Sequence, residues 1–166
     1  MTAPFPKKVT QYLEEVSYAV NKDYVPSTFS LEMVNLIKLI DGGMTENVTP
    51  TVHLKILDSF VDVNNRDIIN LCHRGLAKST LLEYLIFRIA LYGELPNLGK
   101  IPHMIFVGDA MDGGVKKMRK ALESRYVNSD FLQEYLKDTK FTDNRCEFIR
   151  KDGKSLVLSA YGGKTN

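Results

Sequence analysis

The stretch DIINLCHRGLAKSTLLEYLIFRIAL, Asp67 to Leu91, decides the fold of this chain. Its first apolar residues are Ile68, Ile69 and Leu71, a short run typical of a strand that is covered on both faces. The segment from Ser79 to Leu91 is too long for a strand and is apolar on nearly every face, which predicts a buried helix. The stretch therefore predicts a strand, a tight basic loop and a helix in succession.

The loop between these elements, CHRGLAKST at positions 72–80, carries the candidate chemistry. The first N–H groups of a helix lack intrahelical partners and the helix dipole favours an anion there, so Lys-Ser-Thr at a helix start indicates a phosphate-binding loop. Lys78 would reach the β- and γ-phosphates, and the Ser79 hydroxyl would bind Mg²⁺. The regular pattern G-x-x-x-x-G-K-[ST] has glycines where this chain has Cys72 and Ala77. The alternative is an ordinary strand-to-helix turn with a solvated Lys78.

These residues resemble the deviant Walker A motif of the large terminase subunits of tailed bacteriophages, the motors that pump DNA into capsids. That motif is R-G-x-[GA]-K-[ST], and Arg74, Gly75, Ala77, Lys78 and Ser79 match it. The resemblance implies an ATPase with Mg²⁺, in which Lys78 and Arg74 are catalytic and Arg74 senses or stabilises the γ-phosphate. The ATP-binding residues it implies are Cys72, His73, Arg74, Gly75, Leu76, Ala77, Lys78, Ser79 and Thr80.

A helix is also predicted from Pro50 to Phe60, because Leu54, Leu57 and Phe60 recur every three residues. In the terminase family a Pro-x-x-Gln element lies upstream of the first strand, and its glutamine reads adenine. The corresponding residues here are Pro50-Thr-Val-His53. A histidine offers adenine one donor and one acceptor nitrogen, so the resemblance implies that His53 joins the ATP site. The alternative is a surface or cap residue.

Two other helices are expected in the first 60 residues, from Pro6 to Asn21 and from Leu31 to Ile40, the second with Ser30 as its N-cap. We expect them to cover the core, with a docking surface for a partner subunit as the alternative. Asp62 to Asp67 is predicted to form a turn.

After the loop, the sequence predicts a buried strand over His103–Asp109, a helix over Val115–Tyr126 and a short helix capped by Ser129. A β-hairpin is predicted from Arg145 to Gly163, turning at Asp152-Gly153. The alternation of strands and helices predicts a parallel sheet covered on both sides.

Asp109 ends an apolar run in the manner of a Walker B carboxylate, but its successor is Ala110 rather than a second acid. In the family this strand is not the Walker B strand. We therefore interpret Asp109 as a strand-end or helix-capping residue, with a metal ligand as the alternative. A basic series from Lys116 to Arg125 is either a solvated helix face or a contact for DNA phosphates.

Composition sets the broad class of the protein. The chain has 166 residues, 44% hydrophobic and 25% charged, with a net charge of +2, which fits one globular domain. Cys72 and Cys146 suit a reducing compartment, and the sequence lacks both a run of about 18 apolar residues and a signal-peptide pattern. We therefore expect a soluble intracellular protein, in the host cytoplasm if the resemblance holds.

The combined prediction is a three-layer α/β fold, a P-loop NTPase-type parallel sheet in a single domain, with a helical part over 1–60 and the P-loop core over 61–166. In large terminases a hairpin of this kind precedes the Walker B strand, so the resemblance implies an incomplete ATPase domain that ends before Walker B. We therefore expect the chain alone to bind nucleotide weakly and to hydrolyse it negligibly.

The partners implied are double-stranded DNA, the portal and the small terminase subunit. Open sheet edges additionally predict self-association, and no membrane is expected. Two other function classes stay open. One is a compact P-loop phosphotransferase that uses Asp109 for its metal, and the other is an interaction module that does not hydrolyse nucleotide.

Overall fold

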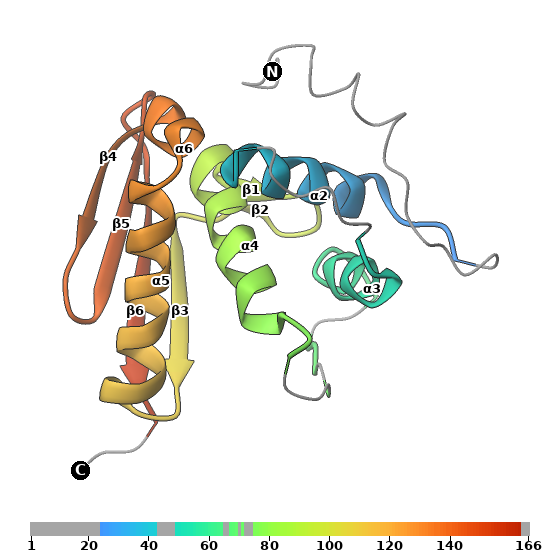
Figure 1. The fold of residues 1–166 in the computed structure, drawn as a ribbon, viewed down its shortest axis with the longest axis horizontal. Coiled ribbons are helices and arrows are strands. Elements are labelled where there is room, and N and C mark those ends of the chain that lie inside the picture. Colours follow the sequence, from blue (N-terminus) through green and yellow to red (C-terminus); the bar gives the residue numbers. More distant parts are fainter. Residues whose placement is uncertain (1–23, 43–48, 65–66, 70, 72–74, 164–166) are drawn as a thin grey trace. The chain divides into compact units, whose positions relative to one another are not determined.

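The computed structural model describes residues 24–42, 49–64, 67–69, 71 and 75–163, and Figure 1 shows its elements along the chain. The chain divides into two compact units, Met1–Leu85 and Ile86–Asn166. Within the described ranges no helix is both long enough and apolar enough to cross a membrane. The helix predicted over Pro6–Asn21 lies outside the described residues.

The first unit contains helices α2 (Thr28–Ile40) and α3 (Thr51–Ser59), as predicted. The N-cap of α2 is Ser27, whose Oγ accepts the N–H of Ser30 at 3.1 Å, so the prediction of Ser30 as the cap was wrong. The Asp58 carboxylate near the end of α3 accepts the hydroxyls of Ser27 and Tyr24. Burial raises the pKa of the Tyr24 phenol, and the hydrogen bond from Tyr24 to Asp58 raises it further.

The strand predicted before the loop is not present in the described residues 67–69 and 71. Ile68, Ile69 and Leu71 are 38%, 81% and 91% exposed, and no described strand pairs with them. Three apolar residues do not fix a strand unless a neighbour supplies the ladder of backbone hydrogen bonds. The preceding turn is confirmed in its described part, where Asp62 accepts the N–H of Asn64 at 2.9 Å.

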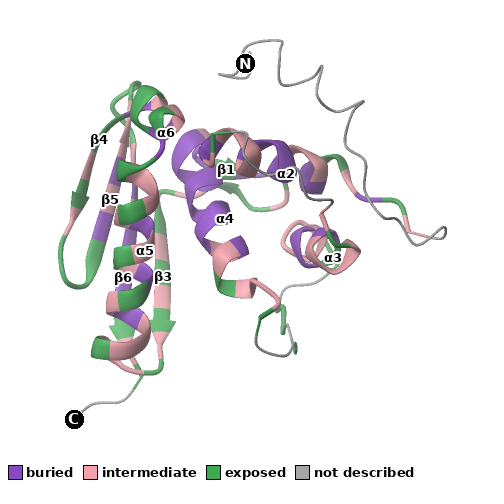
Figure 2. Cartoon of the chain, viewed as in Figure 1, coloured by how far each residue is buried: buried purple, intermediate pink, exposed green. Residues whose placement is uncertain are grey.

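Helix α4 (Lys78–Tyr92) confirms the predicted buried helix and crosses the boundary between the units. Nearly all of it from Leu81 onward is coloured as buried in Figure 2. In the first unit, the Tyr84 hydroxyl donates to Asp41 beyond the end of α2. In the second unit, the rings of Phe87 and Phe148 pack edge to face, with 5.5 Å between their centroids.

After the end of α4, the second unit continues with a small antiparallel pair, β1 (Glu94–Leu95) and β2 (Gly99–Lys100). There follow β3 (His103–Gly108), a π-helical turn η2 (Met111–Val115), α5 (Lys116–Val127) and α6 (Asp130–Tyr135). The strands β4 (Leu136–Phe141), β5 (Arg145–Arg150) and β6 (Ser155–Gly162) complete it. The predicted helices are confirmed here, and Ser129 caps α6 by accepting the N–H of Leu132 at 3.3 Å.

The main sheet has the strand order β3-β6-β5-β4. Only β3 and β6 are parallel, and the β6–β5 and β5–β4 pairs are antiparallel. The fold is therefore α/β as predicted, but this sheet is mixed rather than parallel. The short connections between β4, β5 and β6 explain the difference, because a parallel crossover needs a dozen residues or more.

The two faces of this sheet differ in chemistry. Buried Phe148, Leu156 and Leu158 belong to one face, and α5 contributes the buried side chains of Met118 and Leu122 to the same core. On β3, by contrast, Ile105 and Val107 are 63% and 65% exposed. The expectation of a strand buried on both faces was therefore wrong for β3.

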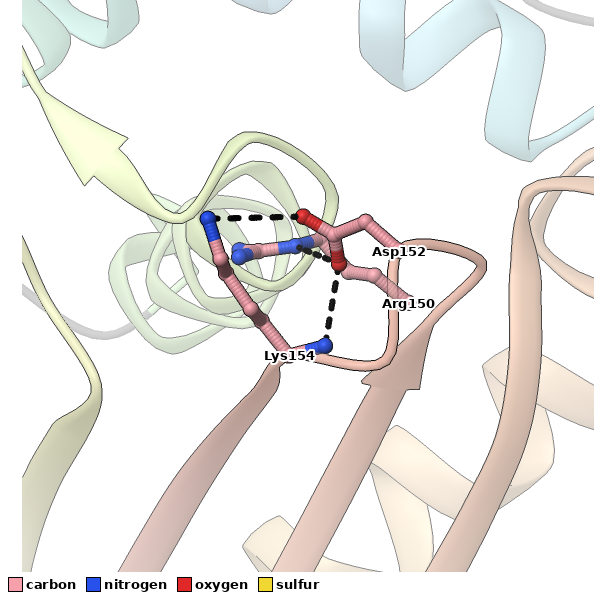
Figure 3. Close-up of polar contacts among 3 residues, drawn as sticks. All are labelled: Arg150, Asp152 and Lys154. Carbon is pink, nitrogen blue, oxygen red and sulfur yellow. Dashed lines mark hydrogen bonds and ion pairs between the residues drawn. The ribbon is translucent and has the colours of Figure 1, made fainter.

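The predicted β5–β6 hairpin is confirmed, and its turn is held by a small polar cluster (Figure 3). Asp152 accepts the N–H of Lys154 at 3.0 Å and the Arg150 Nε at 3.2 Å. Gly153 has a φ of 80°, a left-handed conformation that glycine adopts without strain.

On β5, burial raises the pKa of the Cys146 thiol to about 11, so this cysteine stays protonated at neutral pH.

Candidate phosphate-binding site

The described part of the predicted loop, residues 75–80, lies at the start of α4. Lys78 is the first residue of the helix, and the first helical hydrogen bond runs from the N–H of Leu81 to the Ala77 carbonyl at 2.9 Å. Lys78 and Thr80 are half-buried, and Ser79 is exposed. The lysine and both hydroxyl residues therefore occupy the first turn of α4, as the sequence predicted.

The backbone of this loop is left-handed at two positions. Gly75 has a φ of 92°, and Ala77 has a φ of 51°. Ala77 is the one residue other than glycine with positive φ in the described ranges. A left-handed conformation costs a residue with a Cβ about 1–2 kcal/mol, whereas glycine adopts it readily. Turns with left-handed residues are also the backbone conformation of anion-binding nests.

Ala77 cannot cap its helix through its own side chain. It stands at the N-cap position of α4, and alanine has no side-chain oxygen to accept an N–H group. Helices α2 and α6, by contrast, are capped by serine hydroxyls. The first turn of α4 therefore receives no capping bond from residue 77 and keeps the partial positive charge of a helix N-terminus.

The structure leaves several predicted site residues untested. Cys72, His73 and Arg74 lie outside the described residues, so the γ-phosphate role of Arg74 stays a prediction. His53 is half-buried on α3, and its backbone N–H donates to the Pro50 carbonyl at 2.9 Å. His53 is the third residue of the helix, after the proline N-cap Pro50. Adenine reading by its ring also stays a prediction.

Asp109 has a structural role at the end of β3. Its Oδ1 accepts the N–H groups of Ala110 and Gly114 at 2.9 and 3.1 Å, which fixes the η2 turn before α5. This agrees with the interpretation of Asp109 as a capping residue. No group of three or more His, Cys, Asp or Glu residues suited to a metal ion occurs in the part of the chain that the structure describes.

The basic series on α5 is partly neutralised. Lys116 pairs with Asp112 at 2.6 Å, and Arg119 pairs with Glu123 at 2.8 Å. The hydrogen bond from Lys116 lowers the pKa of the Asp112 carboxyl. Lys117 and Lys120 are exposed on the same helix.

Searches against protein-family models, curated proteins and solved structures found no match to this chain. Functional assignment therefore rests on the chemistry of its own residues.

The sequence did not reveal the left-handed backbone of Ala77, because the residue type gives no sign of it. Left-handed positions are signalled by glycine or asparagine, and an alanine in a loop carries neither signal.

Proposed function

We propose that residues 75–80 bind the phosphates of ATP together with Mg²⁺, and that the chain is the ATP-binding part of a terminase-type DNA-packaging motor. The observation that carries the binding proposal is the left-handed backbone of Ala77 directly before Lys78 at the start of α4. A strained backbone persists only where surrounding structure or function holds it, and such strain clusters at ligand sites.

The proposed chemistry follows from residue types at this position. The Lys78 ammonium would neutralise the β- and γ-phosphates, and the Ser79 hydroxyl would bind Mg²⁺. The N–H groups of the first helical turn would donate to phosphate oxygens. Hydrolysis in such motors is an in-line attack of water on the γ-phosphorus, and it depends mainly on positioning and charge stabilisation. Arg74 would add charge at the γ-phosphate.

The P-loop architecture itself is part of the proposal. The helix that follows the loop supports it, whereas the exposure of Ile68, Ile69 and Leu71 argues against a completed strand before the loop. DNA, the portal and the small terminase subunit are proposed partners on the motif resemblance alone. If α5 contacts DNA, the exposed Lys117 and Lys120 are the groups best suited to reach phosphates.

The phosphotransferase alternative is weaker, because its metal ligand would be Asp109. One carboxylate oxygen of Asp109 already accepts two backbone N–H groups that fix the η2 turn. A metal at this carboxylate would compete with these bonds. We therefore favour nucleotide binding at Lys78 over metal chemistry at Asp109.

The proposal is tested by calorimetric titration of Mg·ADP into the wild-type chain and into Lys78→Ala. We expect the variant to lose at least about ten-fold in affinity, because charge-assisted hydrogen bonds contribute about 1.5–3 kcal/mol. Lys117→Ala is the matched control, since it removes an exposed lysine from the first turn of α5. Equal affinity for Mg·ADP in wild type and in Lys78→Ala would contradict the proposal.

A further inference from the structure

Strand β3 lies at one edge of the main sheet, and its backbone groups point in two directions. The carbonyls of Pro102 and Gly108 accept the N–H groups of Val157 and Gly163, at 3.0 and 2.7 Å, on the side of β6. Successive residues of a strand direct their N–H and C=O groups to opposite sides. Three residues of β3 therefore direct these groups away from β6, to the edge where no described strand pairs with them: His103, Ile105 and Val107.

The side chains of the same residues are exposed, and no residue of β3 is fully buried (Figure 2). Ile105 and Val107 are 63% and 65% exposed. In the register with β6, Val107 lies beside Tyr161, which is itself 53% exposed. The His103 Nε2 lies 2.9 Å from the Ser159 Oγ, on the same face of the sheet. The free edge of β3 therefore borders an exposed face that is largely apolar.

The opposite edge of the sheet, strand β4, has a different composition. It exposes Lys137, Asp138 and Lys140, and its pairing with β5 shifts register between Leu136 and Asp138. Charges and bulges protect a sheet edge from pairing with further strands. The sequence of β3, HMIFVG, contains no Asp, Glu, Lys or Arg, and its pairing with β6 shows no register shift. The sheet is therefore protected at β4 and open at β3.

From these observations we infer that a second copy of the chain docks at the free edge of β3 and adds its own β3 to the sheet. The inference goes beyond the proposed function and does not depend on nucleotide binding. Each copy presents the same unpaired N–H and C=O groups, so the donors of one copy meet the acceptors of the other. The uncharged strand brings no like charges together, and a net charge of +2 gives little repulsion between whole molecules.

Amide hydrogen exchange, followed by NMR on the full chain, tests this docking at the groups that face the free edge. The N–H groups of Ile105 and Val107 should exchange more slowly as the protein concentration rises, because pairing closes them off from water. When sedimentation finds about 90% of the molecules paired, their exchange should be about ten-fold slower than in the monomer. The N–H groups of Met104 and Phe106 face β6, so they are the internal control and should be protected at every concentration.

Ile105→Lys should raise the dissociation constant of the pair at least about ten-fold, because it places like charges on both copies at the docked edge. Leu98→Lys is the matched control, since Leu98 is 67% exposed and lies between β1 and β2. It should leave the dissociation constant unchanged. Thermal unfolding at low protein concentration shows whether each variant is folded.

Slowing of exchange at Ile105 and Val107 that depends on concentration, and that Ile105→Lys removes, supports the inference. Slow exchange at both residues in a monomeric chain would mean that another part of the same chain covers the edge, and it overturns the inference. Association without slowing at these residues, or equal weakening by Ile105→Lys and Leu98→Lys, places the contact elsewhere and also overturns it. So does a chain that stays monomeric up to about 1 mM.

Discussion

Asp152 holds the turn of the β5–β6 hairpin through its carboxylate, and this predicts a pH dependence of stability. The hydrogen bond from the Lys154 N–H, followed by the contact with Arg150, lowers the pKa of Asp152. A carboxyl group with a lowered pKa in the folded state stabilises the fold above its unfolded pKa, about 4, and this contribution is lost as the pH falls through the folded pKa.

Asp152→Asn should therefore be less stable than wild type near neutral pH, and the difference should vanish in acid, where wild-type Asp152 is protonated. Denaturant unfolding at both pH values checks this. Glu134→Gln, an exposed change on α6, is the control for removing one negative charge. A difference of the same size in acid and at neutral pH would contradict the ionic origin of the effect.

His53 carries a prediction about base selectivity. If its ring reads adenine, His53→Ala should reduce the preference for ATP over GTP, because the ring supplies the hydrogen bonds that distinguish the two bases. Competitive titration of both nucleotides measures this preference. Lys55→Ala, on the same helix and exposed, is the control. An unchanged preference in His53→Ala would remove this residue from the proposed site.

At the scale of elements, the junction between the end of β6 and the η2 turn depends on a close approach of two backbones. An ideal Cβ at Gly162 would lie 2.6 Å from the Met111 nitrogen and 3.1 Å from the Ala110 carbonyl carbon. Gly162→Ala should therefore lower the free energy of unfolding by about 1–3 kcal/mol, since backbone atoms must shift. Denaturant midpoints give this value.

Gly113→Ala is the matched control for Gly162→Ala. The nearest atom to its ideal Cβ, Asp109 Oδ1, lies at 3.4 Å, which is ordinary contact. It should change stability little. If Gly162→Ala is as stable as Gly113→Ala, the two backbones are not in close contact in solution.

Elements with a strong local pattern were predictable from the sequence. Helix α4 is apolar around its circumference, and the β5–β6 hairpin has an Asp-Gly turn. Strand β4 was missed because its sequence, LKDTKF, has apolar residues only at its ends, and Lys137, Asp138 and Lys140 between them are exposed. The direction of strand pairing was also wrong, since it depends on partners that are distant in sequence.

The candidate site shows the same division between local and distant information. The position of Lys78 at a helix start followed from the apolar helix and the Lys-Ser-Thr sequence. The strand expected over 67–71 is not found in the described residues there, because a strand needs neighbouring strands to pair with its backbone N–H and C=O groups. The left-handed backbone of Ala77 could not be predicted for a related reason, since surrounding structure rather than residue type imposes such a conformation.

At the scale of the whole molecule, the outer edge of β3 predicts self-association. No described strand pairs with β3 on the side away from β6, and His103–Gly108 contains no Asp, Glu, Lys or Arg. Charged residues, prolines and bulges are the usual protection of such edges. A second copy of the chain is the partner expected at this edge, on a strand where Ile105 and Val107 are exposed.

Val107→Lys should therefore weaken the association, because it adds a like charge to both copies at this edge. Sedimentation at several protein concentrations measures the dissociation constant. Val127→Lys on α5 is the matched control, since Val127 and Val107 are 61% and 65% exposed. Equal effects of the two substitutions would place the association elsewhere.

Binding of nucleotide phosphates at the start of α4 can be followed at single residues by backbone amide NMR. Mg·ADP is titrated into the isotope-labelled chain while the N–H signals of Gly75, Ala77, Ser79 and Thr80 are followed. These signals should shift together, with one dissociation constant, and Lys78→Ala should abolish the shifts. Signals that stay in place at millimolar nucleotide, or shifts confined to other parts of the chain, would contradict it.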